Sequence, residues 1–206
     1  MSLREQNKAR ARQAILAATH DLIVEVGVSE ATTREIAKRA GVSYQTLYNY
    51  YPTKASLLQG VLADDFAAWT ADVQHAVKRY QGDLLDTLRE IAEIGAAHFA
   101  GPRSELWLEI AVAFFDTKSK PLELTQTEFD SLIGVANERY HELLALAQGT
   151  GELREDVDLG LMSYTIFGLT EYAVLRYFAE PDSTIEATLR LLDEQMRLLV
   201  SPYLTR

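Results

Sequence analysis

The sequence predicts an all-α protein with a small N-terminal head and a larger C-terminal body, with about nine helices in all. Apolar residues recur every three or four positions along most of its 206 residues, which is the spacing of helices that bury one face. Glycine and proline interrupt this pattern at intervals, where helices are expected to end. Short β-branched runs such as residues 22–24 lie inside helical periodicity, so no segment favours a strand.

The composition removes several kinds of site from consideration. The chain contains no cysteine, which excludes disulfides, thiolate metal sites and cysteine nucleophiles. Its four histidines are scattered, and neither His141 nor Glu142 has a partner at metal-ligand spacing, so we expect no metal and no cofactor. No apolar run is long enough to cross a bilayer and no signal-peptide pattern is present, so we expect a cytoplasmic protein without a membrane partner.

The first helix follows a polar, basic N-terminal arm. The arm carries Arg4, Lys8, Arg10 and Arg12, and we expect it to be frayed in the free protein and to meet phosphates on DNA. The helix itself is expected to run to about residue 26, with one apolar face, and to end at Gly27. Its predicted task is to brace the elements that follow.

Residues 32–54 have the pattern of two short helices joined by a tight turn. Thr32 starts the first helix through a capping box with the glutamate three residues later, and Gly41 suits the positive φ at its end. Ser43 is a natural N-cap for the second helix, which Pro52 ends. So tight a connection makes the two helices cross steeply, as in a helix-turn-helix, whose second helix enters the major groove of DNA.

The second helix has the composition of a DNA reader. Leu47 is its clear core anchor, and most of its other positions carry polar groups. Glutamine and asparagine pair with adenine, threonine contacts base edges, and tyrosine hydroxyls and lysines reach phosphates. The alternative is a solvated helix hairpin whose tyrosines pack inward. The predicted DNA-binding residues are Thr33, Arg34, Ser43, Tyr44, Gln45, Thr46, Tyr48, Asn49, Tyr50 and Lys54.

This stretch resembles the DNA-binding domain of the TetR family of transcriptional regulators. The similarity rests on Thr-Thr-Arg-Glu-Ile-Ala from Thr32, Ala-Gly-Val-Ser from Ala40, Thr-Leu-Tyr-Asn-Tyr-Tyr from Thr46 and Thr-Lys-Ala-Ser-Leu from Thr53. With the first helix included, it covers about the first quarter of the chain. Tyr51 departs from the family, which often has phenylalanine there, although it should still pack as an aromatic.

Charge is divided unevenly along the chain. The net charge is −10, of which residues 1–54 hold eight Lys/Arg and five Asp/Glu, a net of +3, and the remainder 12 and 25, a net of −13. Such asymmetry indicates a basic DNA-facing head and an acidic body that DNA repels. We therefore expect a helix-turn-helix DNA-binding domain over residues 1–53 and a helical ligand-binding and dimerisation domain over residues 54–206.

The body is expected to consist of helices separated by glycine and proline. One long helix, capped by Thr53, runs to about residue 80 and links the head to the body, and others are expected over about 84–100, 104–115 and 122–148. The segment from 158 to 179 is apolar nearly all round, so it must be covered on several sides. Ser183 and Glu186 form a capping box that starts the last helix.

The last helix predicts a homodimer. Its apolar residues are spaced 4, 3, 4 and 3 apart, which makes a seam for a neighbouring helix. Packing within one chain would also cover this seam, but the TetR resemblance implies a four-helix interface made by the last two helices of each subunit. A helix-turn-helix reader generally needs such a twofold partner. The predicted interface residues are Ile185, Leu189, Leu192, Met196 and Leu199.

The resemblance also implies a small-molecule pocket among the middle helices. Such sites are mostly apolar with a few placed polar groups, although aromatics at helical spacing equally serve as core. Glu171 would favour a cationic ligand and Arg176 a carboxylate, unless these charges pair or face solvent. The predicted pocket residues are Phe66, Trp69, His98, Phe99, Trp107, Phe114, Asn137, Tyr140, Tyr164, Phe167 and Glu171.

Together these features predict a ligand-responsive repressor that binds a palindromic DNA operator as a dimer and is released by a small molecule. The ligand would shift a two-state equilibrium of the two heads, with the helix that starts near Thr53 as the lever. A DNA binder whose body engages a protein partner is the alternative. An enzyme is not expected, because no nucleophile or phosphate-loop motif is present.

Overall fold

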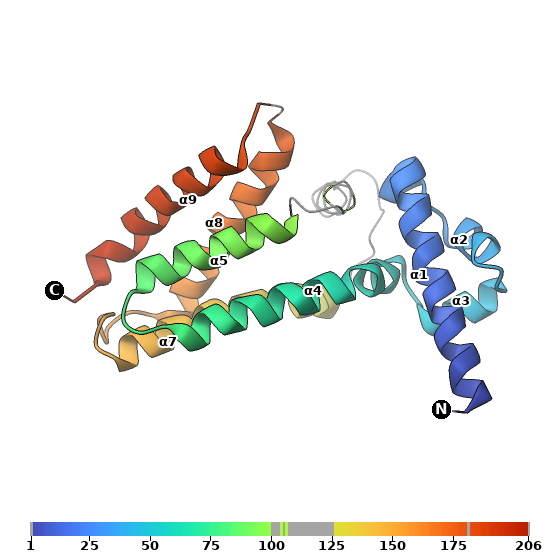
Figure 1. Cartoon of the computed structure of the whole chain (residues 1–206), viewed down its shortest axis with the longest axis horizontal. Helices are drawn as coiled ribbons and strands as arrows, with labels where there is room; N and C mark the ends of the chain where they lie inside the picture. Colours follow the sequence, from blue (N-terminus) through green and yellow to red (C-terminus); the bar gives the residue numbers. More distant parts are fainter. Residues whose placement is uncertain (1, 100–103, 105, 107–125, 181, 206) are drawn as a thin grey trace. The chain divides into compact units, whose positions relative to one another are not determined.

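The computed structural model describes residues 2–99, 104, 106, 126–180 and 182–205. Eight α-helices lie within these residues: α1 (Leu3–Glu30), α2 (Thr33–Arg39), α3 (Tyr44–Tyr50), α4 (Lys54–Arg79), α5 (Leu84–Phe99), α7 (Gln126–Gly149), α8 (Leu159–Ala179) and α9 (Ile185–Val200) (Figure 1). A short 3-10 helix, Ser201–Tyr203, follows α9. The predicted all-α fold is confirmed, and the predicted helix over 104–115 lies almost wholly outside the described residues.

The chain divides into two compact units, which are described separately. The first, called the head below, comprises residues 1–64 with 102–128, and the second, called the body, comprises residues 65–101 with 129–206. The head contains α1, α2, α3 and the first turns of α4. The body contains the rest of α4 with α5, α7, α8 and α9. The domain boundary expected after residue 53 stays a prediction.

Helix α1 includes the basic segment that was expected to be frayed. The Ser2 hydroxyl accepts a hydrogen bond from the Glu5 backbone nitrogen at 3.3 Å, and the Ser2 nitrogen donates to the Glu5 carboxylate at 2.6 Å. These reciprocal bonds close a capping box, so the segment is helical from Leu3 onward. The predicted end at Gly27 is a kink instead: its φ of 82° interrupts the helix, which continues to Glu30.

The head is held by apolar side chains of α1 packed against the two short helices. Burying each large aliphatic side chain contributes roughly 1.5–3 kcal/mol relative to leaving it in water. Arg39 of α2 adds an ion pair to Glu25 of α1, with 2.7 Å between the charged atoms. The nearly fully buried residues of the head include Ile15, Leu22, Ile23, Val28, Ile36 and Leu47.

The body is built around one apolar cluster to which all five of its described helices contribute. Helices α4 and α7 run in the same direction, because Gln74 bonds Arg139 and Tyr80, directly after α4, bonds Thr150, directly after α7. Helices α7 and α8 run in opposite directions and are joined by a hydrogen-bonded pair of hydroxyls, Tyr140 and Thr170, at 3.2 Å. The cluster includes Val73, Leu84, Leu88, Ile91, Leu143, Leu144, Ile166, Leu192 and Met196.

Glu152, in the turn after α7, ties together segments that are distant in sequence. Its carboxylate accepts a hydrogen bond from the Leu84 nitrogen at 2.8 Å, at the start of α5, and another from the Tyr80 hydroxyl. Burial and this bond raise the pKa of Tyr80 to about 12. The Glu152 carbonyl accepts from the Thr205 nitrogen at 2.8 Å, so the last described residues are fastened to the same turn.

The last helix begins one residue later than the predicted capping box would place it. Thr184 is the N-cap, and its hydroxyl accepts from the Ala187 nitrogen at 3.1 Å. The hydroxyl of Ser183, the predicted cap, pairs with that of Thr188 at 3.2 Å. The two adjacent hydroxyls compete for the cap, and the one with the extended backbone next to the first helical residue takes it.

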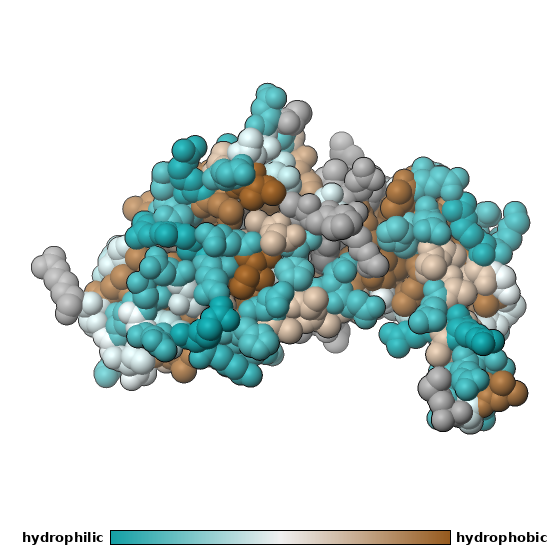
Figure 2. All heavy atoms as spheres, viewed as in Figure 1, coloured by the Kyte–Doolittle hydropathy of each residue, from teal (hydrophilic) through white to brown (hydrophobic). Residues whose placement is uncertain are grey.

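Polar side chains cover most of the surface seen in Figure 2, with apolar patches between them. Within the described parts of the chain, no helix has the length and hydropathy needed to cross a membrane. In the same residues, no group of three or more histidine, aspartate or glutamate side chains is placed to hold a metal ion.

Candidate functional site

The helix-turn-helix of the head is closed by local hydrogen bonds. The hydroxyls of Thr32 and Ser43 cap α2 and α3 by accepting backbone N–H bonds at 3.2 and 3.0 Å. Between the helices, Gly41 has a φ of +68°, and a Cβ added there would meet no atom within 4 Å. Glycine is therefore required by the backbone conformation of this turn and not by crowding. The Val42 nitrogen completes the turn by donating to the Ala37 carbonyl at 3.0 Å.

The outer face of α3 is polar and exposed. Leu47 is its buried anchor, at 1% exposure, whereas Tyr44 and Tyr48 are 50% and 48% exposed and their ring centroids lie 6.4 Å apart. The Gln45 side-chain amide donates to the Asn49 carbonyl oxygen at 3.1 Å. This bond leaves the Gln45 carbonyl oxygen and the Asn49 amide NH2 free to pair with a base. An acceptor and a donor of this kind are what reading base edges in the major groove requires.

The other predicted DNA contacts flank α3. Arg34 is exposed on α2, where no described residue pairs with it, and Thr33 beside it is partly buried. Tyr50 is partly buried at the last position of α3. The ammonium group of Lys54 donates to the Ser29 carbonyl at 3.3 Å, and burial lowers its pKa. Lys54 is thus engaged with the end of α1 in the free protein and must exchange that bond to meet a phosphate.

One interaction at the end of α3 was not anticipated from the sequence. Tyr51, which is 7% exposed, accepts a hydrogen bond from the Arg12 Nε at 3.1 Å, and this bond raises the pKa of the guanidinium. Gly60 of α4 lies so close that an added Cβ would be 2.8 Å from both the Tyr51 ring and the Leu16 side chain. The sequence offered one signal for this contact, the tyrosine at a position where the TetR family often has phenylalanine.

Several predicted pocket residues meet in the interior of the body. Trp69 of α4, Tyr140 of α7 and Phe167 of α8 all belong to its apolar cluster or pack against it. Phe66 contacts Trp69 edge to face, with ring centroids 6.4 Å apart. The Tyr140 hydroxyl is buried, and this burial raises the pKa of Tyr140 to about 12.

The remaining predicted pocket residues lie elsewhere or outside the described structure. His98 pairs with Asp72 at 2.9 Å, linking α5 to α4. Tyr164 is 60% exposed on α8, because that helix turns it away from the core, so it is removed from the predicted pocket. Trp107, Phe114 and the side chain of Phe99 lie outside the described residues.

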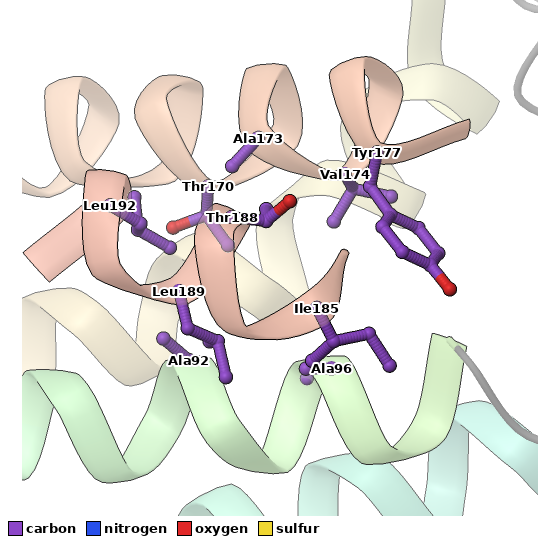
Figure 3. A pocket seen from close by; sticks show the side chains of 11 residues that line it. Ala92, Ala96, Thr170, Ala173, Val174, Tyr177, Ile185, Thr188, Leu189 and Leu192 are labelled. Atoms are coloured by element: carbon purple, nitrogen blue, oxygen red, sulfur yellow. The ribbon is translucent and has the colours of Figure 1, made fainter. Parts of the chain in front are cut away.

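A small cavity of about 40 Å³ lies between α5, α8 and α9 (Figure 3). A volume of this size holds no more than one or two water molecules. None of the predicted pocket residues is among those that line it. Its walls are mostly small or aliphatic side chains: Ala92, Gly95, Ala96, Thr170, Ala173, Val174, Tyr177, Ile185, Thr188, Leu189 and Leu192.

Three polar groups of the predicted pocket have no partner among the described residues. The Trp69 indole nitrogen and the Asn137 carbonyl oxygen are buried without a hydrogen bond. The Glu171 carboxyl is partly buried and has neither a hydrogen bond nor an ion pair, and burial raises its pKa to about 7. Buried polar groups are normally paired, so these three groups are exceptions among the described residues.

The predicted dimer seam is partly covered within the chain itself. Leu192 and Met196 are 3% and 4% exposed and pack in the core of the body, so a second copy cannot reach them. Ile185, Leu189 and Leu199 are partly buried. The 4–3 spacing described a real packing face, but α5 of the same chain covers part of it. The exposed large apolar residues of α8 and α9 are instead Leu161, Tyr164, Tyr172 and Leu198.

Comparison with known sequences places the helix-turn-helix in a described family. The sequence pattern of the "Bacterial regulatory proteins, tetR family" matches residues 15–61. The fatty acid metabolism regulator protein of Bacillus subtilis is 25% identical over 160 residues, which cover 78% of this chain and 79% of that protein. The nucleoid occlusion factor SlmA of Mannheimia succiniciproducens is 30% identical over 87 residues, but the match covers only 40% of its length.

Solved structures extend the similarity beyond the head. FadR of Thermus thermophilus, a TetR-family transcriptional repressor solved with lauroyl-CoA, is 25% identical, with a TM-score of 0.72 over 95% of this chain and 96% of its own. FadR of Bacillus subtilis, solved with stearoyl-CoA, shares the fold with a TM-score of 0.69 over 92% of this chain and 97% of its own, at 21% identity.

The matched segment contains the whole helix-turn-helix, and similarity to a TetR-family repressor continues through the body. Residues 15–61 therefore match the DNA-binding region of the bacterial regulatory proteins of the tetR family, and the described chain shares the fold of a TetR-family repressor.

Proposed function

We propose that this regulator is a ligand-responsive repressor, which binds a palindromic operator as a dimer and leaves it when a small molecule occupies the body. The observation that carries the proposal is the exposed polar face of α3, held on a capped helix-turn-helix by the single buried anchor Leu47. As a regulator of bacterial transcription, it would act in the cytoplasm.

The proposed DNA contacts fall into two groups. Gln45, Thr46 and Asn49 would read base edges, because the amides of Gln45 and Asn49 are exposed on α3 and Thr46 lies between them, partly buried. Tyr44, Tyr48, Tyr50 and the residues flanking the helix would bind phosphates: Thr33, Arg34, Ser43 and Lys54. Phosphate contacts hold the register on the duplex, and base contacts set the sequence preference.

The dimer is proposed to form through the outward faces of α8 and α9. Leu161, Tyr164 and Tyr172 lie three, eight or eleven residues apart on α8, and all are more than half exposed. Leu198 on α9 is 80% exposed. Exposed large apolar side chains such as these are candidates for a protein interface. Two heads in such a dimer would meet half-sites about 34–36 Å apart, which a palindromic operator provides.

Helix α4 is proposed to carry the ligand signal. It is continuous from Lys54 to Arg79 and holds the contact of Gly60 with Tyr51 in the head and the Phe66–Trp69 pair in the body. A ligand that prefers one setting of α4 shifts the balance between DNA-competent and DNA-incompetent dimers by that preference and no more. The effector sites of the two FadR structures, which hold acyl-CoA, support a small molecule with a large apolar part.

A second candidate is a DNA-binding regulator whose body engages a protein. The small size of the cavity between α5, α8 and α9 favours this candidate, since about 40 Å³ admits no effector without rearrangement. Catalysis is not part of either proposal.

The test is binding to the DNA that flanks the protein's own gene, by fluorescence anisotropy at two salt concentrations with a random duplex as control. We expect tight binding to one palindromic fragment at two subunits or a multiple of two, and weak binding to the random duplex. The proposal of an operator-specific repressor would be contradicted if every genomic fragment with a candidate site bound no more tightly than the random duplex, with a strong salt dependence in each case.

A further inference from the structure

We propose that the effector of this regulator is an organic cation, a protonated amine on an apolar body, whose charge binds to Glu171. The inference rests on the ligand-responsive function proposed above and names the chemistry of that ligand. The sequence left two charges open in α8, Glu171 and Arg176, which would select ligands of opposite sign. Their surroundings in the structure separate the two possibilities.

Arg176 is already satisfied on the surface. Its guanidinium donates to both oxygens of Glu180, one turn further along α8, at 2.7 and 3.1 Å. Arg139, which lies deeper in the body, pairs with Glu142 at 2.6 Å. The Nε of Arg139 is buried without a hydrogen bond, but the charge of this residue is matched by the neighbouring carboxylate. Neither Arg176 nor Arg139 therefore offers an uncompensated positive charge to an anionic ligand.

Glu171 is in the opposite situation. No described residue forms a hydrogen bond or an ion pair with its carboxyl group, although the group is partly buried in an otherwise apolar helix. An ionised carboxylate in such surroundings is unfavourable unless a positive charge accompanies it. A bound cation supplies that charge, and an empty site leaves the carboxyl group near neutrality at physiological pH, in line with its raised pKa of about 7.

Two further unpartnered polar atoms lie at a similar level of the body. Tyr140, whose hydroxyl bonds Thr170, interacts electrostatically with Glu171, and Asn137 is one helical turn from Tyr140 on α7. Since α4 runs parallel to α7 and its Gln74 bonds Arg139, Trp69 lies roughly one and a half turns before that level on α4. Polar groups without a hydrogen-bond partner thus occur on α4 (Trp69), on α7 (Asn137 and the Arg139 Nε) and on α8 (Glu171).

The two acceptors among these groups, Glu171 and Asn137, suit an ammonium ion better than an anion, whereas the Trp69 N–H is a donor that an ammonium ion does not satisfy. The Glu171 carboxylate and the Asn137 carbonyl accept hydrogen bonds from N–H donors, and the face of an indole such as that of Trp69 attracts cations. The Phe66–Trp69 pair offers aromatic surface to an apolar chain. The net charge of −13 beyond residue 54 also raises the local concentration of cations. An acyl-CoA, whose phosphates are negative, has the opposite charge at its polar end.

The test is isothermal titration of the full-length protein with three ligands of equal chain length: decylamine as its hydrochloride, decanoate and decan-1-ol. We expect the wild type to bind decylammonium at least about tenfold more tightly than the other two. Glu171→Gln should lose that preference while its affinity for the alcohol stays the same. Glu194→Gln, which removes an exposed carboxylate from α9, is the charge-matched control and should behave like the wild type.

Equal affinity of decylammonium for the wild type and Glu171→Gln would overturn the inference. So would tighter binding of lauroyl-CoA that is unaffected by the same substitution. Thermal unfolding of each variant shows that a loss of binding is not a loss of fold. The two proposals are tested independently. Calorimetry without DNA tests the charge of the ligand, whereas the repressor function is contradicted if the wild type binds no operator.

Discussion

The polar side chains of α3 in the head and those inside the body differ in how their hydrogen bonds are satisfied. On α3, Gln45 bonds Asn49 and Ser43 bonds Thr46, and all four lie at a surface where water satisfies the groups left over. In the body, Trp69 and Asn137 hold buried polar atoms with no hydrogen bond. The surface proposed to read DNA stays hydrated until it docks, whereas buried polar atoms without partners gain hydrogen bonds only from a group that enters the interior.

Removing the anchor of α3 should have the largest effect and would show how far the head depends on one side chain. Leu47→Ala should lower the free energy of unfolding by about 2–5 kcal/mol, because it empties a fully buried site. DNA binding should weaken as well, because α3 loses the buried side chain that holds it against the rest of the head. Urea unfolding and anisotropy measure the two effects. The matched control is Leu146→Ala on α7, which is 43% exposed, and a comparable loss there would contradict the expectation.

Glu171→Gln tests whether an unpaired carboxyl group in the body costs stability, as no exposed polar group of α3 should. We expect this variant to be more stable than the wild type above neutral pH. The pKa of Glu171 is raised from 4.5 to about 7 in the folded protein, so the unfolded chain loses this proton first as pH rises. The stability of the wild type should therefore fall between those two values and level off above the higher one. One pKa unit corresponds to about 1.4 kcal/mol, which sets an upper bound of about 3 kcal/mol on the gain.

Thermal unfolding at about pH 5 and about pH 8 checks this expectation. The difference in Tm between Glu171→Gln and the wild type should be small at the lower pH and larger at the higher one, by about 2–4 °C for each kcal/mol. Glu194→Gln controls for the change in net charge. A Tm difference that does not depend on pH would show that Glu171 has an ordinary pKa.

Gln45→Ala should separate base reading from phosphate binding in the head. We expect affinity for the operator to fall by about 1–3 kcal/mol while binding to random duplex is unchanged, because a lost base contact affects one sequence only. Tyr48→Phe, which removes a proposed phosphate contact, should weaken binding to both duplexes alike. Equal losses on the two duplexes for Gln45→Ala would end its assignment as a base reader.

Tyr51→Phe should have the smallest effect and tests the contact that fastens α1 to the end of α3. It removes the hydroxyl that accepts from Arg12 and leaves the buried ring, so we expect a loss of stability of about 0.5–1.5 kcal/mol. A double-mutant cycle with Arg12→Ala isolates the bond, since the double variant should be no less stable than Arg12→Ala alone. Fully additive losses would mean that the two side chains act independently.

Local signals were sufficient to predict most of the head. Thr32, Gly41 and Ser43 lie at the helix ends where their capping and backbone preferences put them. The error at the N-terminus has a simple cause. Ser2 and Glu5 have the same spacing as Thr32 and Glu35, but charge and terminal position suggested fraying, and the capping bonds prevail.

The body shows where sequence patterns stop being informative. The periodicity of α9 defines an apolar face, yet it does not say whether α5 or a second copy covers it, and Leu192 and Met196 are covered from within. Tyr164 was predicted among the inward aromatics but is 60% exposed, and because α8 is apolar nearly all round, no polar stripe identified its outward face. The hydrogen bonds missing from Trp69 and Asn137 depend on what three separate helices bring together, and no spacing within one helix encodes that.

The fastening of the last residues to the turn after α7 has a consequence for how this region will vary between relatives. The Arg154 nitrogen donates to the Tyr203 carbonyl at 3.0 Å, and the Thr205 nitrogen donates to the Glu152 carbonyl at 2.8 Å. Both bonds join main-chain atoms, so they do not depend on which side chains occupy these positions, whereas a change in the length of the tail would break them. Alignments with relatives should therefore show few insertions or deletions between the turn after α7 and the tail. Shortening the tail should destabilise the body more than substituting its residues.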